Sequence, residues 1–149
     1  MKAAAEVVVE RPLEAVWAWA SDPRNWENWL DGVSDVELRG RLERGARLRS
    51  RYQYAGRSHE IEYEIVERTP SRRQVVRSVS GPFPFEGTLE LAEEAEGTRV
   101  RQTVDAGADS VLTRVIFALG WPLLRRSLRR RIAAQLERMK QAIELTGAN

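Results

Sequence analysis

The chain has 149 residues, of which 42% are hydrophobic and 31% are charged, a length and balance typical of one globular domain with its own core. It has no cysteine and one histidine, which excludes disulfides and thiolate metal sites and argues against a zinc or iron centre or other cofactor. No window reaches the ~20 apolar residues of a membrane span and no apolar signal core is present, so we expect a single cytoplasmic domain over residues 1–149.

The N-terminal quarter predicts a strand followed by two short helices. Alternating valines favour a strand over residues 3–10. Apolar residues at helical spacing then predict a short amphipathic helix that begins at Pro12, a residue suited to a first turn. Asp22 is expected to cap a second short helix, with Pro23 at its first position.

The next segment reads as antiparallel strands, because polar and apolar residues alternate with a period of two. The first hairpin has a predicted two-residue turn at Gly56–Arg57. This register predicts the pairs Tyr54–His59, Tyr52–Ile61, Ser50–Tyr63 and Leu48–Ile65 on one face, and Arg51–Glu62 and Arg49–Glu64 on the other.

A second hairpin is predicted around Gly81–Pro82, followed by a last strand from Thr98 to Asp105. The predicted pairs are Ser78–Phe85, Val76–Gly87, Arg77–Glu86 and Arg73–Glu90, with Arg101 of the last strand opposite Glu90. The strand arginines are therefore expected to form exposed ion pairs across the sheet. Nothing in this pattern points to a nucleic-acid partner.

Ser110 to Thr146 is predicted to form one long helix with a break near Gly120–Trp121–Pro122. Residues 125–140 of this helix contain seven basic residues and one acid. We interpret them mainly as a solvated face, the alternative being a transient contact with an anionic membrane. The apolar stripe of the helix needs a surface to cover, and the strands supply it; its members are Leu128, Ile132, Leu136, Met139 and Ile143.

This order of elements resembles the START-like helix-grip superfamily, and within it the SRPBCC or polyketide cyclase/dehydrase-like proteins. The resemblance is carried by Glu6–Val9, Pro12–Trp17, Ser21–Pro23, Trp29 and the series from Leu128 to Glu144. It implies an α+β fold in which a curved seven-stranded antiparallel sheet wraps around the C-terminal helix, with two short helices after the first strand and a hydrophobic cavity. Relatives bind lipids, sterols, polyketides or quinones, activate chaperones, or cyclise aromatic polyketides. No motif in this chain selects one of these activities.

The inward face of the predicted sheet combines a large apolar lining with phenols, hydroxyls and one imidazole. Such a mixture suits a pocket for the binding or transport of a hydrophobic or amphipathic small molecule, such as a lipid or a polyketide; the alternative is a filled core. The ligand-binding candidates are Tyr52, Tyr54, His59, Tyr63, Ser78, Phe85, Gln102, Phe117, Leu136 and Met139.

Two other functions stay open. His59 and Tyr54 could act as acid and base in a cyclase, aromatase or dehydratase, although no carboxylate is predicted to point inward beside them. The arginine-rich C-terminal helix could instead make the protein a membrane-surface or protein-interaction module. The segment from Val111 to Leu124, with Phe117 and Trp121, could cover the cavity or touch a membrane next to that helix. The sequence does not indicate an oligomeric state.

Overall fold

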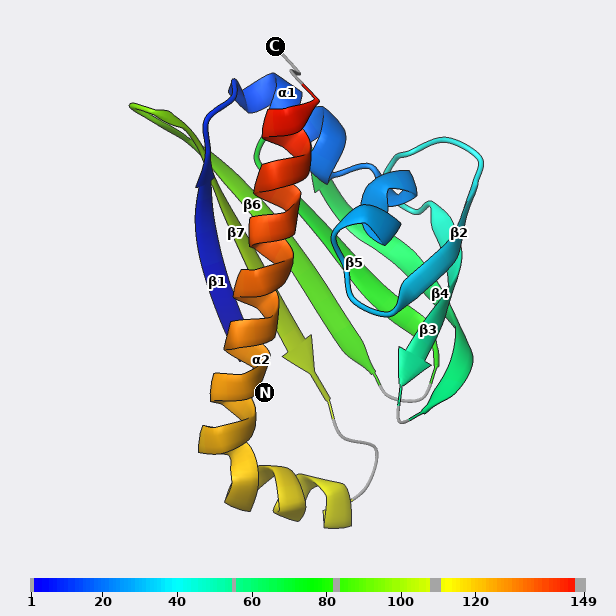
Figure 1. Cartoon of the computed structure of the whole chain (residues 1–149). Helices are drawn as coiled ribbons and strands as arrows, with labels where there is room; N and C mark the ends of the chain where they lie inside the picture. The colour runs from blue at the N-terminus through cyan, green and yellow to red at the C-terminus, as the bar shows by residue number, and fades with distance from the viewer. Residues whose placement is uncertain (1, 55, 82–83, 108–110, 147–149) are drawn as a thin grey trace.

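The long C-terminal helix lies across the concave side of a curved sheet (Figure 1). The computed structural model describes residues 2–54, 56–81, 84–107 and 111–146, and the side chains of residues 54, 111–119 and 121 are outside that description. The elements are β1 (Lys2–Val9), α1 (Leu13–Ala20), the 3₁₀ helix η1 (Pro23–Asn28), β2 (Val33–Arg39), β3 (Arg47–Tyr54), β4 (Arg57–Thr69), β5 (Arg73–Ser80), β6 (Phe85–Glu94), β7 (Gly97–Ala106) and α2 (Val111–Leu145).

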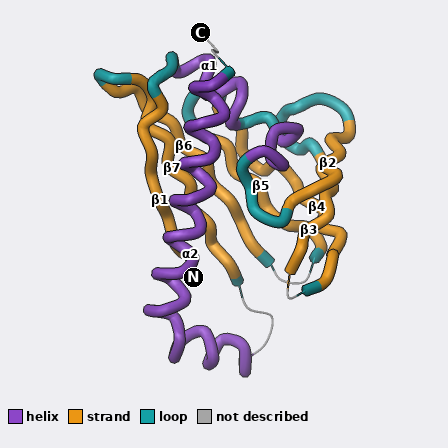
Figure 2. The backbone as a smooth tube through the Cα atoms, in the orientation of Figure 1, coloured by secondary structure: helices purple, strands orange, loops and turns teal. Residues whose placement is uncertain are grey.

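The strands of the described chain form one seven-stranded antiparallel sheet in the order β1-β7-β6-β5-β4-β3-β2. Figure 2 shows the single layer of strands behind α2, with α1 and η1 placed beside the helix. This arrangement confirms the helix-grip fold and the seven strands that the resemblance implied.

The two short helices form where the sequence predicted them. Helix α1 buries Val16, Trp17 and Ala20, which is the apolar face expected from its spacing. Asp22 caps η1, because its side chain accepts a hydrogen bond from the backbone N–H of Arg24 at 3.0 Å. The predicted cap is therefore confirmed.

The register predicted for the first hairpin is wrong by two residues. Tyr54 pairs with Arg57, and Gly56 lies in the turn at φ +75°, so the hairpin closes one residue earlier than predicted. The glycine takes the left-handed position that such a turn requires, and the prediction had placed it at the wrong turn position. The observed pairs are Tyr52–His59, Ser50–Ile61, Leu48–Tyr63, Arg51–Glu60 and Arg49–Glu62 in place of those predicted. Because the slip is even, the described side chains of the two strands keep their predicted faces.

The second hairpin and the last strand pair as predicted. Val76 lies opposite Gly87, and Arg101 lies opposite Glu90. Ser78 also contacts its predicted partner Phe85, since its hydroxyl accepts a hydrogen bond from the Phe85 backbone N–H at 2.9 Å, while on the other side of β5 it pairs with Tyr63 of β4. The predicted cross-strand ion pairs Arg77–Glu86 and Arg73–Glu90 are present at 3.1 and 3.2 Å.

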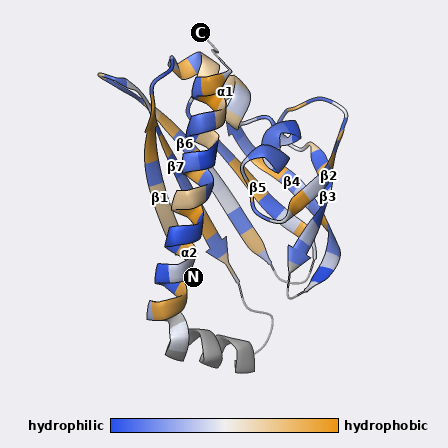
Figure 3. Ribbon diagram, in the orientation of Figure 1, coloured by the Kyte–Doolittle hydropathy of each residue, from blue (hydrophilic) through white to orange (hydrophobic). Residues whose placement is uncertain are grey.

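Helix α2 runs unbroken through Pro122, so the predicted break is wrong at the level of secondary structure. Figure 1 shows its first turns at an angle to the rest, which is the bend expected where proline removes a hydrogen bond and crowds the preceding turn. The hydropathy colouring in Figure 3 shows apolar and polar bands alternating along the helix. Ile132, Leu136, Met139 and Ile143 are completely or almost completely buried, as the stripe predicted.

The described residues contain no helix with the combined length and apolarity that crossing a bilayer requires.

Candidate functional site

A cavity of about 520 Å³ lies between the concave face of the sheet, η1 and the middle of α2. Its apolar wall consists mainly of aromatic residues and of branched aliphatic residues from the strands and the helix. The aromatic members are Trp26, Trp29, Tyr52, Tyr63 and Phe85, and the larger aliphatic members are Leu30, Val33, Ile61, Val76, Leu89, Val104, Leu128 and Ile132.

Tyr63 is the centre of the aromatic wall. Trp26 meets its ring edge-to-face with centroids 5.2 Å apart, and Phe85 does the same at 5.7 Å. The Tyr63 hydroxyl is 2.8 Å from the buried Ser50 Oγ, a hydrogen bond in which either group can donate. Burial raises the pKa of Tyr63 to about 12, against the smaller opposing effect of that hydrogen bond. The phenol is therefore neutral at physiological pH and serves as a fixed hydrogen-bonding group rather than as a base.

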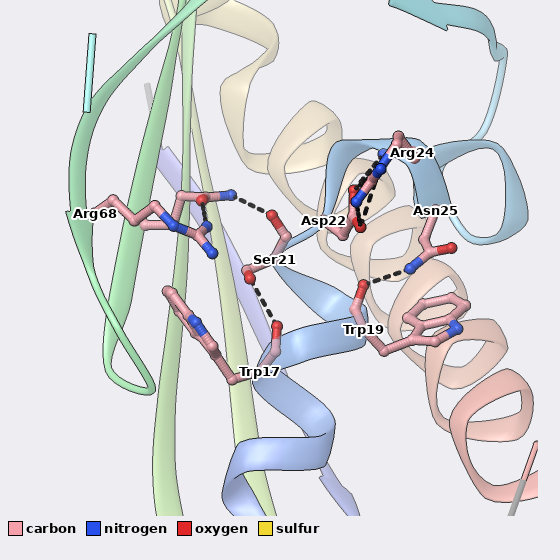
Figure 4. A network of polar contacts seen from close by, with 8 residues as sticks. Trp17, Trp19, Ser21, Asp22, Arg24, Asn25 and Arg68 are labelled. Atoms are coloured by element: carbon pink, nitrogen blue, oxygen red, sulfur yellow. Dashed lines mark hydrogen bonds and ion pairs between the residues drawn. The ribbon is translucent and has the colours of Figure 1, made fainter. Parts of the chain in front are cut away.

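Two glutamines contribute amides to the cavity wall in different ways. Gln74 is hydrogen-bonded at both ends of its amide, because it donates to the backbone carbonyl of Ser21 at 3.0 Å and accepts a hydrogen bond from Arg68. This contact belongs to the polar network of Figure 4, which ties α1 and η1 to the sheet. Gln102 lies above Gly87, where a Cβ atom would stand 3.4 Å from its amide nitrogen. Its side chain makes no hydrogen bond to the described residues, so its amide is available to a ligand.

The charged residues of the wall lie together at one end of the cavity. Arg131 of α2 places its Nε 3.4 Å from Asp31 Oδ2 and donates from Nη2 to the Tyr52 hydroxyl at 3.3 Å. Gln135, one turn further along α2, accepts the backbone N–H of Asp31 at 2.8 Å. The side chains of Arg131 and Asp31 remain 43% and 38% exposed, so this end of the cavity opens to solvent.

The predicted ligand-binding residues divide into three groups. Those on the cavity wall are Tyr52, Tyr63, Phe85 and Gln102. Those elsewhere are His59, half-buried opposite Tyr52; Ser78, bonded to the Phe85 backbone; and Leu136 and Met139, fully buried in the core. The side chains of Tyr54 and Phe117 lie outside the described part of the chain, and so does that of Trp121. The role of each of these residues in binding stays a prediction.

The sequence interpretation missed the polar residues of α2 and of the loop after η1. Leu128, Arg131, Ile132 and Gln135 occupy positions i, i+3, i+4 and i+7, which form one helical face, and all four line the cavity. The predicted apolar stripe includes Leu128 and Ile132 but neither Arg131 nor Gln135, so the two polar residues of this face were not predicted. Asp31 has no comparable signal in the sequence, because only the folded loop brings it to the helix.

The described residues contain no group of three or more His, Cys, Asp or Glu side chains placed to hold a metal ion.

Solved structures with the same fold share little sequence with this chain. TTHA0849 of Thermus thermophilus superposes with a TM-score of 0.78 at 22% identity, over 100% of both chains. StfQ, a di-domain ARO/CYC of the steffimycin biosynthetic pathway, gives 0.76 at 14% identity, over 99% of this chain and 52% of its own. BexL, a di-domain ARO/CYC of the BE-7585A pathway, gives 0.70 at 22%, over 95% and 49%. At these identities the likeness shows the fold alone.

No curated protein matches the chain significantly. The family model described as "Polyketide cyclase / dehydrase and lipid transport" matches residues 1–144. Because that match covers nearly the whole chain, the protein belongs to the polyketide cyclase/dehydrase and lipid transport family.

Proposed function

We propose that the protein binds a hydrophobic or amphipathic small molecule, such as a lipid or a polyketide, in the cavity beneath α2. The observation that supports this most directly is the cavity itself. Its volume of about 520 Å³ falls within the range of ~300–1,000 Å³ found for small-molecule sites. The family description, which covers both polyketide chemistry and lipid transport, agrees with such a ligand.

The core beside the cavity shows that this chain can pack closely. Leu136, Met139 and Ile143 leave no side-chain surface exposed, and they follow the cavity-lining residues along the same helix. The apolar side chains that face the cavity have fewer protein atoms packed against them than these buried neighbours, so they gain less dispersion energy from the protein itself. A ligand that fills the space would supply the missing contacts, and this favours a binding function for the cavity.

Native mass spectrometry of gently purified protein tests the proposal. We expect an adduct of a few hundred daltons that disappears in a denaturing spectrum. A fluorescent apolar probe, phenylnaphthylamine, should bind the adduct-free protein and be displaced by an extract of the released ligand. A spectrum without adduct, together with no binding of the probe, would contradict the proposal.

A catalytic function of the cyclase, aromatase or dehydratase type is the first alternative, and StfQ and BexL are named as ARO/CYC proteins. The geometry gives less support to the His59–Tyr54 pair. His59 is not among the described residues of the cavity wall, and Tyr52 rather than Tyr54 lies opposite it. The alternative requires His59→Gln to abolish turnover of a poly-β-keto substrate, and unchanged turnover would remove this pair from consideration.

Contact with an anionic membrane is the second alternative, and an exposed apolar pair favours it. Leu123 and Leu124 are 77% and 42% exposed, and Arg125 and Arg126 follow them directly. Leu128, one turn further, lines the cavity. Apolar side chains flanked by arginines are suited to the headgroup region of an anionic bilayer, and here they would place the cavity close to it.

Co-sedimentation with vesicles separates this alternative from simple ligand binding. Vesicles that contain phosphatidylserine should retain the protein at low salt and release it at high salt, whereas pure phosphatidylcholine vesicles should not retain it. Leu123→Ser combined with Leu124→Ser should reduce retention while leaving phenylnaphthylamine binding unchanged. No retention at low salt would remove the membrane alternative.

A further inference from the structure

The open end of the cavity carries an excess of positive charge. Asp31 is shared by two arginines of α2, because Arg138 also contacts its carboxylate. One negative and two positive side chains leave this cluster with one uncompensated positive charge. In a partly enclosed, largely apolar site such a charge interacts more strongly with an anion than it would in bulk water.

The two arginines have different tasks. Arg138 donates to the backbone carbonyl of Trp29 at 3.0 Å as well as to Asp31, so it fastens α2 to the loop after η1. Arg138 does not line the cavity, whereas Arg131 does. The attachment of helix to loop is thus made without Arg131, and a purely structural role leaves the position of Arg131 on the cavity wall unexplained.

Arg131 also keeps most of its hydrogen-bonding capacity. A guanidinium has five N–H donors, and the only hydrogen bond from Arg131 to a described residue goes to the Tyr52 hydroxyl at 3.3 Å. Its contact with Asp31, at 3.4 Å, is looser than a strong charge-assisted hydrogen bond of about 2.7–2.9 Å. The fork of Arg131 is therefore charged, positioned by two neighbours and still able to donate to a ligand.

We propose that Arg131 binds an acidic head group, so that the ligand is an amphipathic anion whose apolar body lies against Trp26, Tyr63 and Phe85. This inference rests on the proposed binding function and narrows the ligand class. A carboxylate or an ionised enol supplies the planar, negatively charged oxygen acceptors that a guanidinium binds in a bidentate manner. Tyr52 accepts a hydrogen bond from Arg131, and Gln135 fixes the backbone of the neighbouring Asp31.

Two fluorescent probes of nearly equal shape test the proposal. Anilinonaphthalene sulfonate carries one anionic group, and phenylnaphthylamine is the same ring system without it. The wild-type protein should bind the sulfonate more tightly than the neutral probe. Arg131→Gln should weaken binding of the sulfonate about tenfold, the effect of losing one charge-assisted contact, and should change binding of the neutral probe less than about twofold.

Arg130→Gln is the matched control, because Arg130 is an exposed neighbour on the same helix that does not line the cavity. It removes the same charge and should leave the affinity for both probes close to that of the wild type. Asp31→Asn should have the opposite effect to Arg131→Gln and tighten binding of the sulfonate. Arg131→Lys, which keeps the charge but loses the planar fork, should retain part of the preference.

The outcomes distinguish this inference from the function on which it rests. If neither probe binds the wild-type protein, the cavity does not accept such molecules and the proposed function fails. If the neutral probe binds and Arg131→Gln leaves the ratio of the two affinities unchanged, the anion site is overturned and the cavity proposal stands. An equal loss in Arg130→Gln would overturn it as well, since it would assign the effect to the general charge of the helix.

Discussion

At the scale of single residues, Tyr63 joins the core to the cavity. Its ring packs between Trp26 and Phe85, and its hydroxyl ends at the buried Ser50. The apolar surroundings that pack against this ring also disfavour the charged phenolate. Burial therefore raises the pKa of Tyr63 to about 12. One side chain therefore links packing, hydrogen bonding and the dependence of stability on pH.

Tyr63→Phe should flatten the loss of stability in alkaline solution. The folded protein holds the phenolic proton up to about pH 12, whereas the unfolded chain releases it near pH 10.0. Raising the pH through this window favours the unfolded chain and removes up to about 2–3 kcal/mol from the wild-type free energy of unfolding. Urea unfolding at pH 9 and pH 11 should show a loss that is smaller by about 1 kcal/mol in Tyr63→Phe.

Ser50→Ala is the control for this experiment, because it removes the hydrogen-bond partner and keeps the phenol. Its free energy of unfolding should fall by about 1–2 kcal/mol at neutral pH, while the alkaline loss persists. A wild-type protein and a Tyr63→Phe variant with the same slope between pH 9 and 11 would contradict the role assigned to the buried phenol.

At the scale of elements, one end of the pairing between β1 and β7 requires a glycine. Gly97 begins β7 with φ +149°, and a Cβ atom there would stand 2.1 Å from the backbone oxygen of Val9. The same end of β1 receives α2, since Lys140 donates to the backbone carbonyl of Val8 at 3.0 Å. The close contact between Gly97 and Val9 therefore fixes the position of the end of β1 that α2 contacts.

Gly97→Ala should destabilise the protein by about 3 kcal/mol or more, because the methyl group meets backbone that cannot move aside without separating the strands. Gly45→Ala is the matched control. Gly45 also has a positive φ, of +90°, but nothing lies within 4 Å of its added Cβ, so only the conformational cost of about 1–2 kcal/mol remains. Equal losses in urea unfolding would show that the contact with Val9 is not the cause.

The two hairpins show which features of the sheet the sequence determines. Alternation fixes the inward face of each strand, and this was predicted correctly for both hairpins. The second hairpin has oppositely charged pairs that fit one register, which the structure confirms. In the first hairpin, Arg49 can meet Glu60, Glu62 or Glu64 with similar charge complementarity, and only the backbone conformation at Gly56 selects among them.

The candidate site was less predictable than the fold for a related reason. Inward positions on the strands follow from a period of two, so Tyr52, Tyr63 and Gln102 could be placed from the sequence. Contacts between α2 and the loop after η1 depend on how far the helix lies from the sheet, which no periodicity encodes. Asp31 and Arg131 are 100 residues apart along the chain and meet only in the folded protein.

At the scale of the whole molecule, α2 divides the interior into a filled part and an open part. Toward its C-terminus the helix lies close to β1 and buries Leu136, Met139 and Ile143 completely. Toward Pro122 the same helix presents Leu128 and Arg131 to the cavity. Packing in the filled part holds the helix in place, so that the open part can persist without collapse.

This division predicts that the open part can be filled without loss of the fold. Gly87 lies on the cavity wall between Val76 and Val104, and its neighbour in the cavity is the flexible amide of Gln102. Gly87→Phe should therefore place an aromatic ring in the open space, at a strand position that favours one. We expect the free energy of unfolding to stay the same or to rise, while phenylnaphthylamine binding weakens at least about tenfold, as measured by urea unfolding and fluorescence titration.

Val79→Phe, at an exposed position of β5, adds the same ring outside the cavity and should leave probe binding unchanged. Loss of stability in Gly87→Phe together with undiminished probe binding would mean that the space beneath α2 is not where small molecules bind, because a ring that fills the binding space must compete with its ligand.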